Sequence, residues 1–238
     1  MPLDSSTNPG SSIATFGDQV LDFYRTLKRP PLRYTGVEWI DPYDLPEVRR
    51  SMDAFYGAFY DDNRQRLFLL GINPGRFGAG VTGIPFTDGH HLAASCGIPN
   101  TLPQRQELSA GFIHRVVQAW GGANAFFRQI YITAVCPLGL LRDGVNFNYY
   151  DDRTLMAEME PFLVETLSRQ MAIGARTHAA IVIGTGKNLQ AMQRLNDRHH
   201  FFDSLRAVEH PRFIMQYRRK QIDRYVDDYV RAIAASLG

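Results

Sequence analysis

A buried-strand pattern that leads directly into a glycine- and proline-rich loop limits the fold more than any other part of this chain. The apolar run 67–70 precedes the segment 71–88, which contains five glycines and two prolines. A continuous apolar run of this kind is typical of a parallel strand covered on both faces. In open α/β sheets, the loops at the carboxyl ends of such strands form the ligand crevice. Segment 71–88 is therefore the first candidate for a binding site.

Alternating helix and strand patterns continue along the chain and indicate the fold class. Apolar residues at helical spacing alternate with short apolar runs, which favours a parallel sheet with helices on both faces. We expect an α/β fold of three layers, α/β/α, with a central four-stranded parallel sheet. We also expect a disordered segment at 1–12 and a single domain over 13–238. The expected strands are 66–71, 130–135, 179–183 and 205–208, and the expected helices are 16–27, 46–60, 106–120, 155–173, 188–195 and 222–237.

Composition and terminal sequence exclude several classes of protein. The 238 residues include only two cysteines, Cys96 and Cys136, too few for a disulfide framework or a four-cysteine iron–sulfur cluster. The first residues lack the basic start and apolar core of a signal peptide, and no apolar run is long enough to span a bilayer. We therefore expect a monomeric cytoplasmic protein without a membrane partner, associated with the nucleoid if its source is bacterial.

Segment 71–88 closely resembles the first motif of the uracil-DNA glycosylase superfamily, above all that of the single-strand-selective monofunctional uracil-DNA glycosylases. The family pattern is Gly-Met-Asn-Pro-Gly, then Phe-Gly, then Thr-Gly-Val-Pro-Phe. This chain has Gly-Ile-Asn-Pro-Gly at 71–75, Phe-Gly at 77–78 and Thr-Gly-Ile-Pro-Phe at 82–86, as in a divergent bacterial-type subgroup. The resemblance implies the α/β/α fold and a DNA glycosylase of base excision repair, which hydrolyses the N-glycosidic bond of a damaged base.

Two residues match the catalytic positions of that family. Asn73 matches the residue that positions the attacking water, and an amide can orient water although it hardly deprotonates it. His210, followed by Pro211 as at the start of the second family motif, matches the donor to the base oxygen on which negative charge develops. A donor at such a place is often the largest catalytic contribution. Asp88, the carboxylate of the first motif, is either a water-activating base or, as we favour, a loop cap.

The expected substrate pocket departs from the family at one position. The target base must leave the stack before it can react, and Phe86 matches the residue that stacks on the flipped pyrimidine. Ala134 stands where the family has a base-reading Asn, and Asn146, Asn148 or backbone groups of the same loop can take that role. The departure predicts a pocket that accepts hypoxanthine, xanthine or oxidised pyrimidines as well as uracil. The motif residues expected to bind substrate with these are Gly71, Ile72, Pro74 and Gly75.

Two further segments are expected to contact DNA. Six basic residues against two acidic ones lie within 205–224, and a local basic surface of this kind neutralises phosphate charge. The residues after Pro211 form either an apolar wedge for the gap left by an extruded base or the start of a packed helix. The turn 184–188 resembles a Gly-x-Gly turn of the family and suits a helix N-terminus near phosphate. The expected DNA-contacting residues are Gly184, Gly186, Lys187, Pro211, Arg212, Phe213, Ile214 and Met215.

Metal and cofactor chemistry are not expected. The adjacent pairs His90-His91 and His199-His200 lack the spacing of zinc ligands, and hydrolysis by water needs no cofactor. No lysine in the motif loop is available to form a Schiff base, which predicts a monofunctional enzyme. Two alternatives stay open: a catalytically silent protein that binds damaged DNA, in keeping with Ala134, and a hydrolase of free nucleosides, which the basic cluster disfavours.

Overall fold

A central parallel sheet organises the computed structural model, which describes residues 14–238. The expected disorder of 1–12 lies outside these residues, and the single-domain organisation stays a prediction. The sheet has the strand order β3-β2-β6-β7, and every residue of β2 and β3 is buried, as the apolar runs predicted. Its strands are β2 (Arg66–Gly71), β3 (Ile130–Ala134), β6 (Ala175–Ile183) and β7 (Leu205–Val208).

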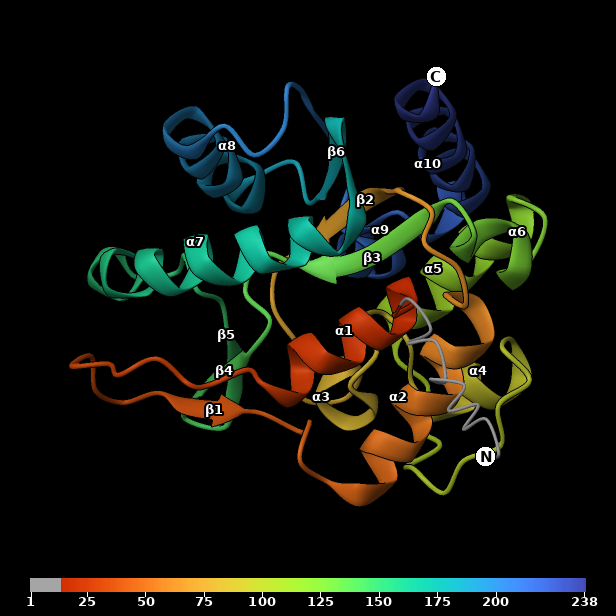
Figure 1. The fold of residues 1–238 in the computed structure, drawn as a ribbon. Helices are drawn as coiled ribbons and strands as arrows, with labels where there is room; N and C mark the ends of the chain where they lie inside the picture. Colours follow the sequence, from red (N-terminus) through yellow and green to blue (C-terminus); the bar gives the residue numbers. More distant parts are fainter. Residues whose placement is uncertain (1–13) are drawn as a thin grey trace, which may run out of the picture.

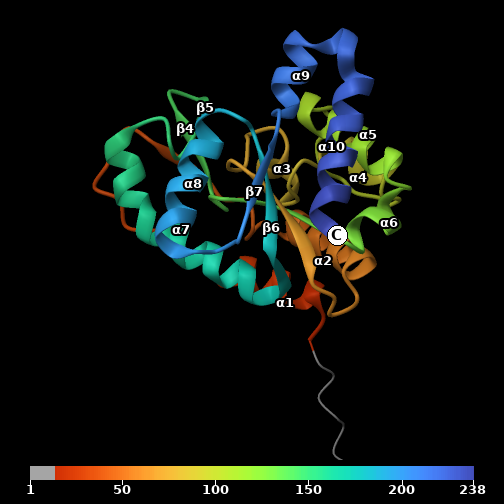
Figure 2. The same ribbon diagram turned by 90° about the horizontal axis from the view of Figure 1, so that it is seen from above.

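Helices cover both faces of this sheet and confirm the predicted three layers (Figure 1). Figure 2 shows α7 (Arg153–Gly174) and α8 (Lys187–His199) on one side of the strands, with α5 (Leu108–Ala119) and α10 (Ile222–Leu237) on the other. The N-terminal helices α1 (Phe16–Arg25) and α2 (Pro46–Phe59) pack against each other, and α1 also packs against α7. No helix within 14–238 is long and apolar enough to cross a membrane.

Short elements absent from the sequence prediction complete the fold. A second, antiparallel sheet has the order β1-β4-β5, and its strands are too short to show a clear alternation of apolar and polar residues. Strand β6 begins four residues earlier than predicted because polar residues occupy 176–178. The added elements are β1 (Glu38–Ile40), β4 (Gly139–Arg142), β5 (Val145–Phe147), α3 (Ala79–Thr82), α4 (Gly89–Ala94), α6 (Ala123–Phe127) and the 3-10 turn Arg219–Gln221. Helix α9 (Pro211–Tyr217) is the helix that the sequence left open as an alternative.

Candidate active site

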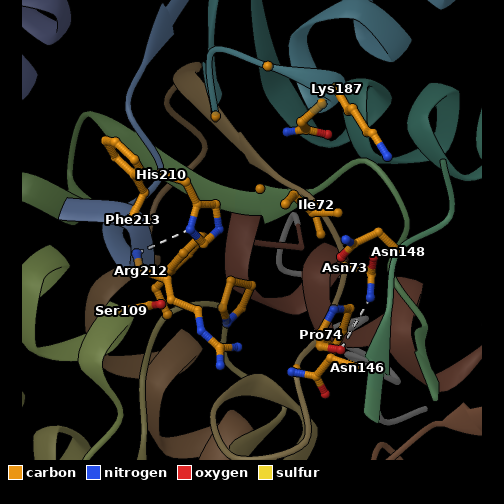
Figure 3. Close-up of a pocket in the computed structure, with 18 of the residues that line it drawn as sticks. Ile72, Asn73, Pro74, Ser109, Asn146, Asn148, Lys187, His210, Arg212 and Phe213 are labelled. Carbon is orange, nitrogen blue, oxygen red and sulfur yellow. Dashed lines mark hydrogen bonds between the residues drawn. The ribbon is translucent and has the colours of Figure 1, made fainter. Parts of the chain in front are cut away.

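A cavity of about 650 Å³ opens at the carboxyl ends of the four parallel strands (Figure 3). This is the place at which open α/β sheets bind ligands, and each strand or the loop after it contributes to the wall. Most of the residues predicted from the two motifs come together here. Those that line the cavity are Gly71, Ile72, Asn73, Pro74, Gly75, Phe86, Ala134, Asn146, Asn148, Gly184, Gly186, Lys187, His210, Arg212 and Phe213.

Asn73 lines the cavity and carries a buried acceptor that has no partner within residues 14–238. Its Nδ2 donates to the carbonyl of Phe147, 3.3 Å away, and more weakly to that of Pro74, at 3.5 Å. These bonds fix the amide plane, and Oδ1 is buried with no partner in the part of the chain that the structure describes. A buried acceptor without a donor costs free energy, which a water bound at this atom would recover. An amide of this kind can hydrogen-bond a water molecule but hardly deprotonate one.

Phe86 forms an apolar wall whose position depends on glycine and on backbone strain. A Cβ at Gly71 would lie 2.9 Å from the Phe86 ring, so only glycine lets the ring lie against the end of β2. The backbone of Phe86 has φ 53°, an uncommon conformation for a bulky residue. The Thr82 hydroxyl holds the turn by donating to the carbonyl of Thr87 at 2.6 Å. The loop thus fixes a flat aromatic face beside the His210 ring, with centroids 6.0 Å apart.

His210 is neutral and has a defined tautomer. The backbone N–H of Arg212 donates to Nδ1 at 3.2 Å, which makes His210 the N-cap of α9. Since Nδ1 accepts, the ring proton is on Nε2, and that N–H is free to donate to a ligand. Burial, with a smaller contribution from the Arg212 charge, lowers the pKa of His210 to about 4. The ring can therefore donate a hydrogen bond near neutral pH without carrying a positive charge.

Helix α9 divides the predicted DNA-contacting residues between two faces. Pro211, Ile214 and Met215 lie at helical spacing on the face turned toward the protein, and Ile214 is fully buried. None of these three lines the cavity, and the segment forms the packed helix that the sequence left open as the alternative. A wedge is contradicted for the fully buried Ile214, and contact of the other residues with DNA stays a prediction. Arg212 and Phe213 lie on the exposed face and line the cavity with two neighbours that the sequence analysis did not single out, Gln216 and Tyr217.

Two asparagine side chains that line the cavity, Asn146 and Asn148, offer one free donor and one free acceptor. Oδ1 of Asn146 accepts from the backbone N–H of Arg76 at 3.1 Å, which leaves Nδ2 as a donor. Nδ2 of Asn148 donates to Asp151 at 2.9 Å, which leaves Oδ1 as an acceptor. Ala134 itself brings only a methyl group to the cavity. Both amides line the same cavity as Ala134 and carry hydrogen-bonding groups that its methyl group lacks.

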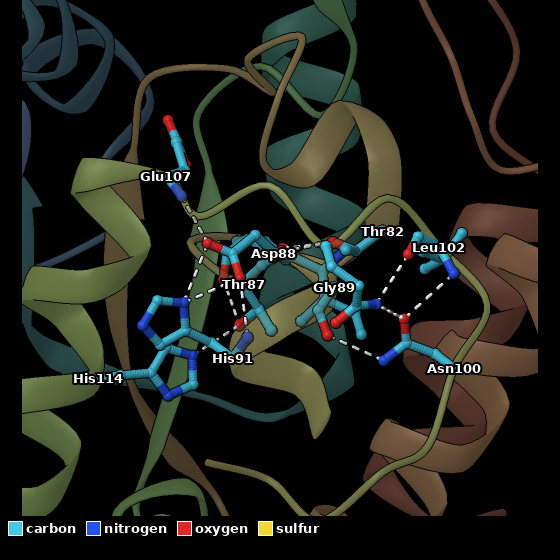
Figure 4. Close-up of polar contacts among 12 residues, drawn as sticks. Thr82, Thr87, Asp88, Gly89, His91, Asn100, Leu102, Glu107 and His114 are labelled. Atoms are coloured by element: carbon cyan, nitrogen blue, oxygen red, sulfur yellow. Dashed lines mark hydrogen bonds and ion pairs between the residues drawn. The ribbon is translucent and has the colours of Figure 1, made fainter. Parts of the chain in front are cut away.

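Asp88 is a structural cap, and it does not line the cavity. The carboxylate is fully buried and accepts from the backbone N–H groups of His91 at 2.8 Å and Glu107 at 2.7 Å (Figure 4). It also accepts from Nδ1–H of the His91 ring at 2.8 Å. Burial alone would raise the pKa of Asp88, but these hydrogen bonds outweigh it and hold that pKa below its usual value. The loop-cap interpretation is the one the geometry supports.

Glu107 is the main lining residue that sequence reasoning missed. It is the N-cap residue of α5, and its carboxyl group packs so closely on Gly78 that a Cβ there would displace it. Burial, and then the nearby Asp88 charge, raise the pKa of Glu107. Nothing in the motifs marks this residue, because long-range contacts place it. The other missed lining residues are Ala79, Pro85, Ser109, Thr133, Tyr150, Asp151, Thr185, Asn188 and Glu209.

Two of these lining residues have structural roles at the cavity floor. Asn188 donates to the carbonyls of Leu70 and Ile183 and accepts from the Tyr149 hydroxyl at 3.0 Å. It therefore joins the ends of β2 and β6 and has no group left for a ligand. Thr133 donates to the side chain of Gln170, below the sheet end. Across residues 14–238, no three His, Cys, Asp or Glu side chains gather as a metal site would require.

The buried His114 makes the protein's stability depend on pH. Its ring stacks on His91, with centroids 4.9 Å apart, and burial followed by His91 lowers the pKa of His114 to about 4. Unfolded histidine titrates near 6.5, so between these values the unfolded chain binds a proton that the folded chain does not. The free energy of unfolding should therefore fall as pH decreases from 6.5 towards 4. We expect His114→Gln to flatten this dependence in urea denaturation, and an unchanged difference between pH 7 and pH 5 would contradict it.

The family model of the uracil-DNA glycosylase superfamily matches residues 58–234. The chain therefore belongs to this superfamily, whose members act on DNA as glycosylases. Among solved structures it is similar to wild-type SMUG2 from Pedobacter heparinus, with 38% sequence identity, a TM-score of 0.89 and coverage of 94% of this chain and 98% of that one. No curated protein matches the sequence. These matches confirm the family and the fold expected from the two motifs.

Proposed function

We propose that this protein is a monofunctional DNA glycosylase that hydrolyses the N-glycosidic bond of uracil and of other deaminated or oxidised bases. One observation carries the proposal: a free acceptor on Asn73, the flat face of Phe86 and the Nε2–H donor of His210 meet in one cavity. The base leaves the DNA stack and enters the cavity. Phe86 stacks on it, and His210 donates to the oxygen on which negative charge develops.

The reaction order follows from the side chains available. Asn73 cannot remove a proton from water, so the glycosidic bond breaks before water attacks the positively charged sugar. Lys187, the lysine that lines the cavity, has its amine 3.6 Å from Asp151 and 68% of its side chain exposed. An ammonium held in this way is a poor nucleophile, which supports hydrolysis without a Schiff base. The product is then a free base and an abasic site.

The polar groups near Ala134 support a broad substrate range. Asn146 offers a donor and Asn148 an acceptor, and the edges of uracil and xanthine both present a carbonyl beside an N–H. Since Ala134 brings no bulky amide into the cavity, a purine ring meets less steric opposition. We therefore place hypoxanthine, xanthine and 5-hydroxymethyluracil beside uracil as candidate substrates. The basic 205–224 segment favours DNA, which carries many phosphates, over free nucleosides, which carry none.

The test is base release from end-labelled oligonucleotides that each carry a single uracil, hypoxanthine, xanthine or 5-hydroxymethyluracil. Abasic sites are revealed by alkaline cleavage, and Asn73→Ala serves as the inactive comparison. Release by the wild-type protein and not by the variant would support the proposal and rank the bases. If no base is released while DNA binding persists, the silent lesion-binding function would replace it.

A substitution at Ala134 should narrow the range of substrates. In Ala134→Asn, the new amide reduces the room for a purine while it can hydrogen-bond a uracil edge. We expect xanthine and hypoxanthine release to fall about tenfold or more relative to uracil, as pocket discrimination of this kind allows. Ala134→Leu introduces a side chain similar in size to Asn but without polar atoms. It should reduce purine release without giving the uracil edge a hydrogen-bond partner. Equal selectivity in wild type and Ala134→Asn, measured as ratios of kcat/KM, would show that residue 134 does not contact the base.

A further inference from the structure

Two arginines share one aromatic ring in the loop that follows β2. The guanidinium carbon of Arg76 lies 4.5 Å from the ring centroid of Phe77, and that of Arg105 lies 3.8 Å from it. Both arginines are exposed, whereas Phe77 is half-buried. Stacking on an aromatic face is a favourable position for a guanidinium group. The ring therefore holds two positive charges near each other at the surface.

Within the described residues, 14–238, neither positive charge has an acidic partner. Among the ion pairs within 14–238, none involves Arg76 or Arg105. Arg76 is held in place by the carbonyl of Gly144, to which its Nη1 donates. Without an acidic partner, each guanidinium group keeps N–H donors for an anion that reaches the surface beside the Phe77 ring.

This arginine pair is adjacent to the cavity. Arg76 directly follows Gly75, which lines the cavity, and its backbone N–H is bonded to the lining residue Asn146 at 3.1 Å. On the other segment, Glu107 lines the cavity two residues after Arg105. A DNA strand with one base in the cavity must run its phosphates past the surface around the opening. The pair therefore lies where the strand's charge would pass.

We propose that Arg76 and Arg105, stacked on Phe77, form a binding site for one backbone phosphate of the DNA strand whose base occupies the cavity. The proposal rests on the proposed function and adds to it a means of holding the strand. Planar guanidinium groups bind phosphate oxygens with two parallel hydrogen bonds. Stacking on Phe77 reduces the freedom that each arginine side chain loses on binding. The site contributes to the affinity for DNA and not to the bond-breaking step.

The salt dependence of DNA binding tests this site. Binding of a labelled single-stranded oligonucleotide containing one uracil is measured over a series of KCl concentrations, with Asn73→Ala present throughout to prevent turnover. Each phosphate that a protein neutralises on a single strand contributes about 0.7 to the slope of log K against log salt. We expect the slope to decrease by this amount when Arg76→Gln and Arg105→Gln are combined. Arg25→Gln, which removes an exposed arginine paired with Asp53, is the matched control and should leave the slope unchanged.

A neutral methylphosphonate, introduced at one phosphate position at a time, identifies the contacted phosphate. We expect that at one position the methylphosphonate weakens DNA binding by the protein that retains Arg76 and Arg105. At the same position it should not weaken DNA binding by the double variant. Loss of binding at every position alike, or an unchanged slope in the double variant, would overturn the proposal. A third outcome would assign the site to free anions instead. In that outcome no single phosphate position is found, and inorganic phosphate displaces the DNA whereas chloride at equal ionic strength does not.

Turnover separates this proposal from the proposed function. With Asn73 intact, the double variant should release uracil with a kcat within about twofold of wild type and with a raised KM. A large loss of kcat with an unchanged salt slope would mean that the arginines support the loop, and would overturn the phosphate site. If the wild-type protein releases no base but the double variant still has a reduced salt slope of DNA binding, the proposed glycosylase activity is contradicted. The phosphate site is then still supported. Phe77→Leu should weaken binding if stacking positions the arginines.

Discussion

Replacement of His210 by alanine is expected to slow base release by about 10²–10³-fold, the loss found when one donor to a developing negative charge is removed. Nδ1 of His210 accepts from the backbone N–H of Arg212, which leaves Nε2–H as the ring's free donor in a residue that lines the cavity. The measurement is single-turnover release of uracil from an oligonucleotide with enzyme in excess. Binding of the same DNA should change much less than the rate.

A second variant separates catalysis from helix capping. His210 is also the N-cap of α9, and loss of a cap costs about 1 kcal/mol. His210→Asn keeps a favourable N-cap residue but its shorter side chain cannot place a donor where Nε2 lies. We therefore expect His210→Asn to be as stable as wild type and as slow as His210→Ala. Wild-type rates in His210→Asn would show that the imidazole acts only through the helix.

The pH profile should show no titration of His210 near neutrality. Because the pKa of this ring is lowered to about 4, the neutral Nε2–H form is present throughout the range from about 5 to 8. The donor is thus the same species over that range, and kcat should not follow an ionisation near 6.5, the usual pKa of histidine. A step in kcat at that pH that disappears in His210→Asn would show that the imidazolium form is the active one.

The central sheet was predictable from the sequence because burial on both faces leaves a plain signal. Both boundaries of β2 were predicted because all six of its residues are buried. The boundaries of β7 were also predicted, although only Val208 of its four residues is buried. The antiparallel strands β1, β4 and β5 gave no such signal, because their three or four residues are only partly buried. Helix α9 was ambiguous for another reason: only its packing against α5 shows which of its apolar residues face inward.

The site was predictable where a local motif fixes the residue and not where distant contacts do. Asn73, Phe86 and His210 come from two motifs whose internal spacing reflects the turns that hold them. Glu107 reaches the cavity because Asp88, nineteen positions earlier, binds its backbone N–H, and no local pattern records this contact. Ala134 was correctly placed in the cavity, but the orientation of the neighbouring amides depends on residues that hydrogen-bond them from other segments.

Replacement of Asp88 by alanine is expected to lower the free energy of unfolding by about 3–5 kcal/mol, as for a buried ionic group that loses its partner. The carboxylate accepts from two backbone N–H groups and from the His91 ring. Without it, these donors are buried with no acceptor, and each costs about 1–3 kcal/mol. The start of α4 and the start of α5 are no longer tied together. Equilibrium urea denaturation at pH 7 gives the measurement.

Asp88→Asn distinguishes a cap from a catalytic base. The amide keeps one acceptor oxygen and the volume of the side chain, so we expect it to lose less stability than Asp88→Ala. Its kcat for uracil release should remain within about fivefold of wild type, because the carboxylate is turned to His91 and Glu107 and not to the cavity. A base that activates water could not be replaced by an amide at so small a cost. A kcat as low as that of Asn73→Ala in a folded Asp88→Asn protein would therefore restore the water-activating role.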